Sequence, residues 1–184
     1  MKGTSAKPKR VAALLLFGIA GLLAVRVAAG FLAADVMESA YLDWCAETGY
    51  PANEYGLNCE RTTGFLEAST RTLPVDLLAL IALCTLGIMV LEVGRAGRIL
   101  TYLAASFYPL WAVLSTDYFL NLQDRLAGAA VLTFPEVVPQ WYLGVSVAIG
   151  PVTAVLLLVA AATLAIATRT AEKQESRPVT ATSR

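Results

Sequence analysis

Arg26 is the residue whose type and position most suggest chemistry in this chain. It interrupts an apolar segment, residues 11–34, that carries no other charge. A charged side chain inside a membrane is costly, and it usually pairs with another group or lines a pathway. Arg26 follows Arg10 by 16 positions, about 24 Å along a helix, so we expect it near the outer edge of a hydrocarbon core roughly 30 Å thick. It would then snorkel outward or pair with Asp76 or Asp117; the functional alternative is contact with a substrate or a lipid headgroup.

Two of the three cysteines suggest a disulfide. Cys45 and Cys59 lie in one polar segment, and the glycines, proline and asparagine between them allow the chain to turn back. In an oxidising compartment this spacing favours a bridge, which stabilises a loop of this length by about 3 kcal/mol in the chain-entropy account. Two free thiols are the alternative. Cys84 lies within an apolar run, where we expect it to pack as a small apolar residue.

The rest of the residue inventory excludes several kinds of site. The chain has no histidine, and this removes the commonest metal ligand, the usual haem ligand and the usual general base near neutral pH. It also has no C-x-x-C pair, glycine-rich nucleotide loop or serine elbow. We therefore expect no catalytic residue, no cofactor, no metal and no nucleic-acid partner. One enzymatic hypothesis remains open, a reaction at the outer surface through carboxylates such as Asp117 and Asp124.

The amino-acid composition indicates that much of the chain lies in a membrane. Hydrophobic residues make up 57% of the 184 residues and charged residues only 15%, against about 25% charged in average soluble proteins. We predict an all-α membrane protein, a bundle of four transmembrane helices. The expected spans are residues 11–34, 75–94, 99–116 and 141–168, since each is long and apolar enough to cross.

The charges between these spans predict the orientation. Ten of the 14 Lys and Arg residues fall in residues 1–10, 95–98 and 169–184, which the positive-inside rule assigns to the cytoplasm. Only three fall in residues 35–74, an acidic outer loop, and residues 117–140, a second outer loop that is partly apolar. Both termini are therefore expected inside, with 95–98 a tight turn and 169–184 a disordered tail.

The N-terminus also fits a cleaved signal peptide, with residues 1–10 as its basic region and cleavage after Val27-Ala28-Ala29. The apolar run continues beyond Arg26 for another eight residues, which favours an uncleaved anchor. Arginine exceeds lysine, and alanine, valine and leucine dominate the apolar positions, as in GC-rich bacteria. We expect a multi-pass protein of the bacterial cytoplasmic (plasma) membrane.

Local sequence patterns predict where the helices begin, end, bend and approach each other. The first helix is expected to continue outward to Glu47, because apolar residues recur there on one face. Thr72 fits an N-cap, with Pro74 and Asp76 in the first turn of the second span. Bends are expected at Tyr108-Pro109 and Gly150-Pro151. The apolar face beyond the first span comprises Val36, Ala40, Tyr41 and Trp44. Close helix approach is expected at small residues, namely Gly18, Ala20, Gly21, Ala24, Gly144 and Ala148.

The function that these features favour is a non-catalytic accessory or interaction subunit of a bacterial envelope complex. The outer loops carry apolar residues that suggest a compact cap, stapled by Cys45–Cys59, that binds a protein or lipid partner. Within the second outer loop, Leu126–Phe134 lies on the membrane, re-enters it or packs on the first loop. The alternative is a small transporter or channel subunit that uses Arg26 and works as a homo-oligomer, because four spans with so few polar groups hardly line a hydrophilic path alone.

Overall fold

The computed structural model describes residues 6–48, 70–92, 95–122 and 138–175. In these residues the chain forms four helices, each long and apolar enough to cross a membrane. They are α1 (Ala6–Thr48), α3 (Leu73–Glu92), α4 (Arg95–Leu120) and α6 (Gln140–Glu175). The predicted all-helical, multi-pass architecture is confirmed at this level.

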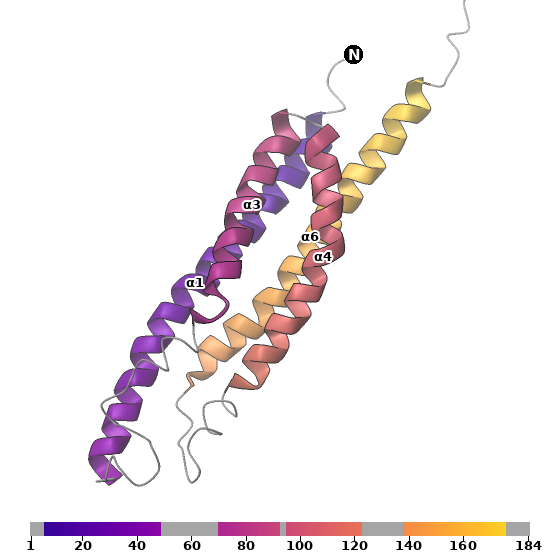
Figure 1. Ribbon diagram of the computed structural model, residues 1–184. Helices are drawn as coiled ribbons and strands as arrows, with labels where there is room; N and C mark the ends of the chain where they lie inside the picture. The colour runs from indigo at the N-terminus through magenta and orange to yellow at the C-terminus, as the bar shows by residue number, and fades with distance from the viewer. Residues whose placement is uncertain (1–5, 49–69, 93–94, 123–137, 176–184) are drawn as a thin grey trace, which may run out of the picture.

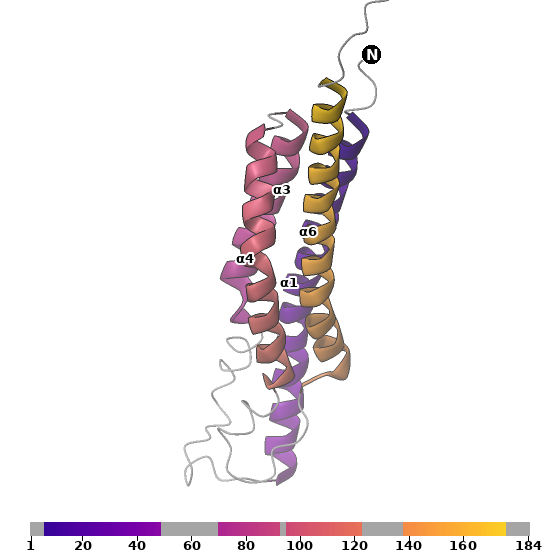
Figure 2. The ribbon, with the colours of Figure 1, turned by 90° about the vertical axis from the view of Figure 1, so that its right-hand side faces the viewer.

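The four helices run alternately up and down along one common direction. α1 begins at the end of the bundle where α3 and α6 finish and where α4 begins (Figure 1). α1 packs against α3 and α6, and α4 packs against α6 and less extensively against α3. The view turned by 90° shows the same alternation, with α1 and α4 running downward and α3 and α6 running upward (Figure 2).

The interior of the bundle holds two apolar clusters. The larger cluster joins α1, α3, α4 and α6 around Leu16, Leu23, Leu83 and Leu157. The smaller cluster lies toward the other end, around Met37, Tyr41, Phe119 and Tyr142. Large apolar side chains also cover the outside of the helices, as Phe107 on α4 does with 71% of its surface exposed. In a bilayer these outward side chains face lipid, and the helices associate through close packing and polar contacts.

α1 extends past the ends of α4 and α6 (Figure 1). The predicted continuation of the first helix is confirmed, since α1 ends only at Thr48. Its buried face matches the expected one in part: Tyr41 is buried and Trp44 half-buried, as predicted, but Met37 is also buried and Val36 and Ala40 are exposed. The buried positions continue the four-residue ridge of Ala29 and Ala33, and this ridge packs against the end of α4 and the beginning of α6.

The other helix ends follow local sequence. α3 begins directly after Thr72, whose carbonyl accepts the first helical bond from Asp76 N at 2.9 Å, as expected for an N-cap. α4 already begins at Arg95, so residues 95–98 are its first turn and not the connection predicted. α6 continues to Glu175, into the predicted tail, because alanine, glutamate, lysine and glutamine at 171–175 favour helix.

Both prolines of the apolar spans lie inside continuous helices. Pro109 is within α4 and Pro151 within α6. Tyr108 directly precedes Pro109, and Thr153 follows Pro151 by two residues. The hydroxyl groups of Tyr108 and Thr153 form a 3.0 Å hydrogen bond. Membrane helices tolerate proline where neighbouring helices and hydroxyl side chains stabilise the local backbone, and this bond provides such a contact between α4 and α6.

The close approaches of the helices are not at the glycines that the spacing suggested. A Cβ atom at Gly18, Gly21 or Gly144 would meet nothing within 4 Å. A Cβ atom at Gly97 would lie 2.6 Å from Val90 N, and one at Gly150 would lie 2.8 Å from Thr116 Oγ1. Of the small residues that the spacing suggested, Ala20 is buried in the larger apolar cluster, whereas these three glycines meet no neighbouring helix. Spacing alone does not say which face of a helix meets a neighbour.

Several sequence predictions fall outside the described residues. Cys45 lies near the end of α1, but its side chain is outside the described part, as are Cys59, Asp124 and Leu126–Phe134. Cys84 is described: it is a free cysteine that packs, half-buried, against the larger apolar cluster. Its predicted role as an apolar packing residue is confirmed.

Candidate functional site

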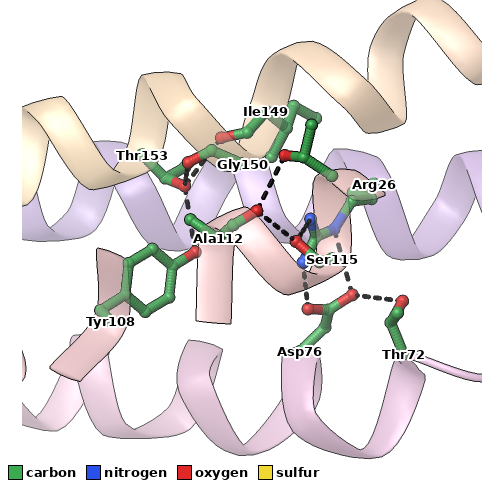
Figure 3. Close-up of polar contacts among 10 residues, drawn as sticks. Arg26, Thr72, Asp76, Tyr108, Ala112, Ser115, Ile149, Gly150 and Thr153 are labelled. Carbon is green, nitrogen blue, oxygen red and sulfur yellow. Dashed lines mark hydrogen bonds and ion pairs between the residues drawn. The ribbon is translucent and has the colours of Figure 1, made fainter. Parts of the chain in front are cut away.

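Arg26 lies between the two apolar clusters, in a layer of buried polar side chains. It is only 2% exposed, and Asp76 on α3 is only 1% exposed. Figure 3 shows the guanidinium of Arg26 and the carboxylate of Asp76 pointing toward one another across α1 and α3. Because α1 and α3 pack against each other, the two charges are held together in the interior of the bundle.

The ion pair is bidentate. Arg26 Nε donates to Asp76 Oδ2 at 3.1 Å, and Arg26 Nη2 donates to Asp76 Oδ1. Two parallel bonds between a guanidinium and a carboxylate are stronger and more directional than single neutral bonds. Thr72 Oγ1 donates a third bond to Asp76 Oδ2 at 3.0 Å, so the N-cap residue of α3 also positions the carboxylate.

α4 contributes the remaining contacts of Arg26. Arg26 Nη1 donates to Ser115 Oγ over 3.5 Å, a long and therefore weak bond, and Ser115 Oγ donates to the carbonyl of Ala112 at 3.1 Å. The guanidinium carbon also lies 5.9 Å from the centre of the Phe119 ring, within the range of a cation–π contact. One side chain of α1 thus contacts both α3 and α4.

This polar layer lies close to one end of the bundle. Asp76 is the fourth residue of α3, Tyr142 is the third residue of α6, and Ser115 precedes the end of α4 by five residues. At 1.5 Å per residue these positions are about 3–8 Å from the helix ends. The layer therefore lies near the end of the bundle at which α4 ends and α3 and α6 begin.

A small cavity adjoins the ion pair. It has room for roughly one water molecule. It is lined by side chains of the polar layer and of the smaller apolar cluster, namely Arg26, Thr70, Thr72, Asp76, Phe119 and Tyr142, with Val27, Gly30 and Leu73. Polar groups on several sides allow a bridging water, whereas a solute larger than water does not fit in this conformation.

The chemistry available to this layer follows from its charges. One cation and one anion neutralise each other, and each also has hydroxyl contacts. Removing two charges from water costs several kcal/mol per ion, and only such paired geometry offsets the cost. Among the described residues, no group of three or more Cys, Asp or Glu could hold a metal ion. The layer is therefore suited to fixing the relative positions of α1, α3 and α4.

Sequence reasoning named two partners for Arg26, and the structure selects Asp76. Asp117 is exposed on α4 and instead accepts a 3.1 Å bond from Asn121 Nδ2. Ser115 and Phe119 were not identified from the sequence. The sequence does indicate that Ser115 and Phe119 act together, because residues four positions apart share one face of a helix.

In comparisons with known proteins, no family model matches this chain, and no curated protein or solved structure matches it. The observations that bear on function are therefore the contacts of Arg26 and the arrangement of the helices.

Proposed function

We propose that this chain is a non-catalytic accessory or interaction subunit of a bacterial envelope complex, which presents its outer end to a protein or lipid partner. The observation that carries this proposal is the extension of α1 beyond the bundle (Figure 1). We call residues 35–48 the arm. At 1.5 Å per residue the arm is about 21 Å long, comparable to a small recognition helix.

The arm has one packed side and one open side. Tyr41 is buried, and its ring stacks on Trp44 with a centroid distance of 6.0 Å. Asp35, Leu42, Asp43 and Glu47 are exposed. An anchored helix loses little conformational freedom when a partner binds, so such an arm is a favourable binding element.

The charges at the two ends of the bundle support the proposed orientation, with both termini in the cytoplasm. The arm carries four acidic residues and no basic one. The opposite end, where α1 and α4 begin, carries Lys7, Lys9, Arg10, Arg95 and Arg98. The positive-inside rule assigns that basic end to the cytoplasm and the arm to the outside of the plasma membrane.

A cap closed by a Cys45–Cys59 disulfide belongs to the same proposal. Tyr41 packs in one cluster with Leu122 and Val138, which directly flank residues 123–137. The second outer loop therefore leaves and re-enters the described bundle beside the arm. Cys45 is one helical turn after Tyr41, so a bridge from it would tie the first outer loop to the same place.

A second candidate is a small oligomeric transporter or channel subunit in which Arg26 acts on the solute. The observation that favours it is the buried Arg26–Asp76 pair beside a cavity. Such a protein would need an opened conformation, because the cavity accommodates roughly one water. In that case removal of both charges, Arg26→Met with Asp76→Leu, abolishes transport while the protein still inserts and folds, because no unpaired charge remains.

Purification of tagged protein from native membranes separates the two candidates. The arm variant is Asp43→Arg with Glu47→Arg, two exposed positions. The pair variant is Arg26→Met with Asp76→Leu, which removes both buried charges together. For an interaction subunit we expect mass spectrometry to show a partner that the arm variant loses and the pair variant keeps. Retention by the arm variant together with loss from the pair variant would contradict the proposal.

A further inference from the structure

The end of the bundle opposite the arm collects basic side chains from three helices. We call this set the basic end: Lys7, Lys9 and Arg10 on α1, Arg95 and Arg98 on α4, and Arg169 on α6. Both views place the beginnings of α1 and α4 and the last part of α6 at this end (Figures 1 and 2). Because α6 packs against both α1 and α4, Arg169 lies on a helix that neighbours the other two groups.

The basic end begins where the apolar core stops. The last fully buried residues toward this end are Ala12 on α1, Val90 on α3 and Leu164 on α6. Arg10 precedes Ala12 by two residues and Arg169 follows Leu164 by five, which is about 3 and 8 Å along the helices. These charges are therefore level with the boundary of the hydrocarbon core, where phospholipid headgroups lie.

Few acidic residues oppose these charges. Glu92, at the end of α3, is the acidic side chain that the described residues place at this level. In the sequence of α6, Glu172 and Glu175 accompany Lys173 farther from the core. The net charge at the headgroup level is thus strongly positive, and this favours anions over zwitterions.

One arginine of the basic end is held in place. Arg98 Nη1 donates to Thr168 Oγ1 at 2.8 Å, which positions its guanidinium across the interface between α4 and α6. Arg169 is the next residue after Thr168 and is exposed, as is Arg95 at the start of α4. Guanidinium groups match the geometry of phosphate oxygens, and positional restraint before binding lowers the entropic cost.

We infer that the basic end is a binding surface for anionic phospholipid headgroups, formed chiefly by Arg95, Arg98 and Arg169 between α4 and α6 and extended by the lysines and arginine of α1. The inference rests on the charge and depth of these residues and is independent of the proposed partner at the arm. Each basic residue near an anionic surface contributes roughly a fivefold factor in association.

Spin-labelled lipids test this inference on the full chain in mixed vesicles of phosphatidylcholine and phosphatidylglycerol. We expect labelled phosphatidylglycerol to associate with the protein several-fold more strongly than labelled phosphatidylcholine. The triple variant Arg95→Gln, Arg98→Gln, Arg169→Gln should lower this preference to near one, since each basic residue contributes roughly a fivefold factor. The triple Arg→Lys variant should retain most of it, and Arg71→Gln, a single change of the same kind at the opposite end, should leave it unchanged.

Salt and free phosphate distinguish a lipid headgroup site from a site for inorganic phosphate. High salt should reduce the preference, because the Debye length falls to about 3 Å at 1 M. Inorganic phosphate should compete no better than chloride of equal ionic strength. If the triple Gln variant does not fold, replacement of Lys7, Lys9 and Arg10 by glutamine serves instead, and the preference should again fall. Equal association of both lipids with the unmodified protein, an undiminished preference in the folded Gln variants, or specific competition by phosphate would overturn the inference.

Discussion

Removal of the carboxylate from the buried ion pair should strongly destabilise the bundle. In Asp76→Asn the Arg26 guanidinium loses its two charge-assisted bonds, and the side chain that is only 2% exposed keeps its positive charge. Such bonds contribute roughly 1.5–3 kcal/mol each, and breaking one buried pair typically costs about 3–5 kcal/mol. The location near the end of the bundle allows Arg26 to move outward, so we expect about 3 kcal/mol, the lower part of that range.

The double variant Arg26→Met, Asp76→Leu should recover most of this loss. It leaves no unpaired charge, and replacement of a buried pair by apolar residues of similar volume is often neutral or stabilising. The free energy of unfolding can be measured in mixed micelles by circular dichroism during titration with a denaturing detergent. Together with the single variants Arg26→Met and Asp76→Leu, the double variant gives a coupling energy, which we expect to exceed about 1 kcal/mol.

The matched control is Asp117→Asn, the same change at an exposed carboxylate near the same end of the bundle. It should alter the unfolding free energy by no more than about 0.5 kcal/mol. A loss below about 1 kcal/mol for Asp76→Asn, or additive effects of the two pair substitutions, would refute the reasoning that the pair fixes α1 against α3.

Three further predictions concern other contacts. Gly97→Ala should destabilise the bundle by about 1–3 kcal/mol, because its Cβ would lie 2.6 Å from the backbone of α3, whereas Gly144→Ala, with nothing within 4 Å, should be neutral in the same assay. Tyr108→Phe should cost about 0.5–1.5 kcal/mol through loss of its 3.0 Å hydrogen bond to α6, and no change in unfolding would contradict the contact. In oxidised native membranes Cys45 and Cys59 should resist a membrane-impermeant thiol reagent until a reductant is added; free labelling would disprove the disulfide.

The four long helices were predictable because their signal is local. A bilayer demands about 20 apolar residues in each spanning helix, and uncharged runs of that length stand out in any sequence. The extension of α1 was also predictable, since no glycine or proline interrupts residues 35–48. The beginning of α4 at Arg95 and the end of α6 at Glu175 were less predictable, because a helix can continue beyond its apolar run.

The partner of Arg26 was only half predictable. The depth predicted for Arg26 restricted the choice to acidic residues at the ends of the spans that were predicted to face outward. Asp76 and Asp117 met this condition. The selection depends on rotation of each helix about its axis: Asp76 faces inward, and Asp117 faces outward. The sequence of one helix does not show which of its faces is buried when the helix is apolar on all sides, as α3 is.

The same limitation applies to the glycines. Gly144 and Gly150 are both in α6, yet only Gly150 lies against α4. A Cβ atom added at Gly150 would be 2.8 Å from Thr116 Oγ1, whereas one added at Gly144 would have no neighbour within 4 Å. Spacing identified small residues, but it could not identify the neighbour that each would meet. The facing of each helix comes from tertiary packing, which is a property of the assembled bundle.

The placement of the arm outside the cell and of the basic end inside it is the central claim, and reporter insertion tests it most directly. A reporter active only in the cytoplasm is inserted between α3 and α4, and separately after Thr48 at the end of the arm. We expect activity at the first position and none at the second, with both proteins at equal levels in the membrane. An inactive reporter between α3 and α4, or an active one after Thr48, would contradict the proposed orientation.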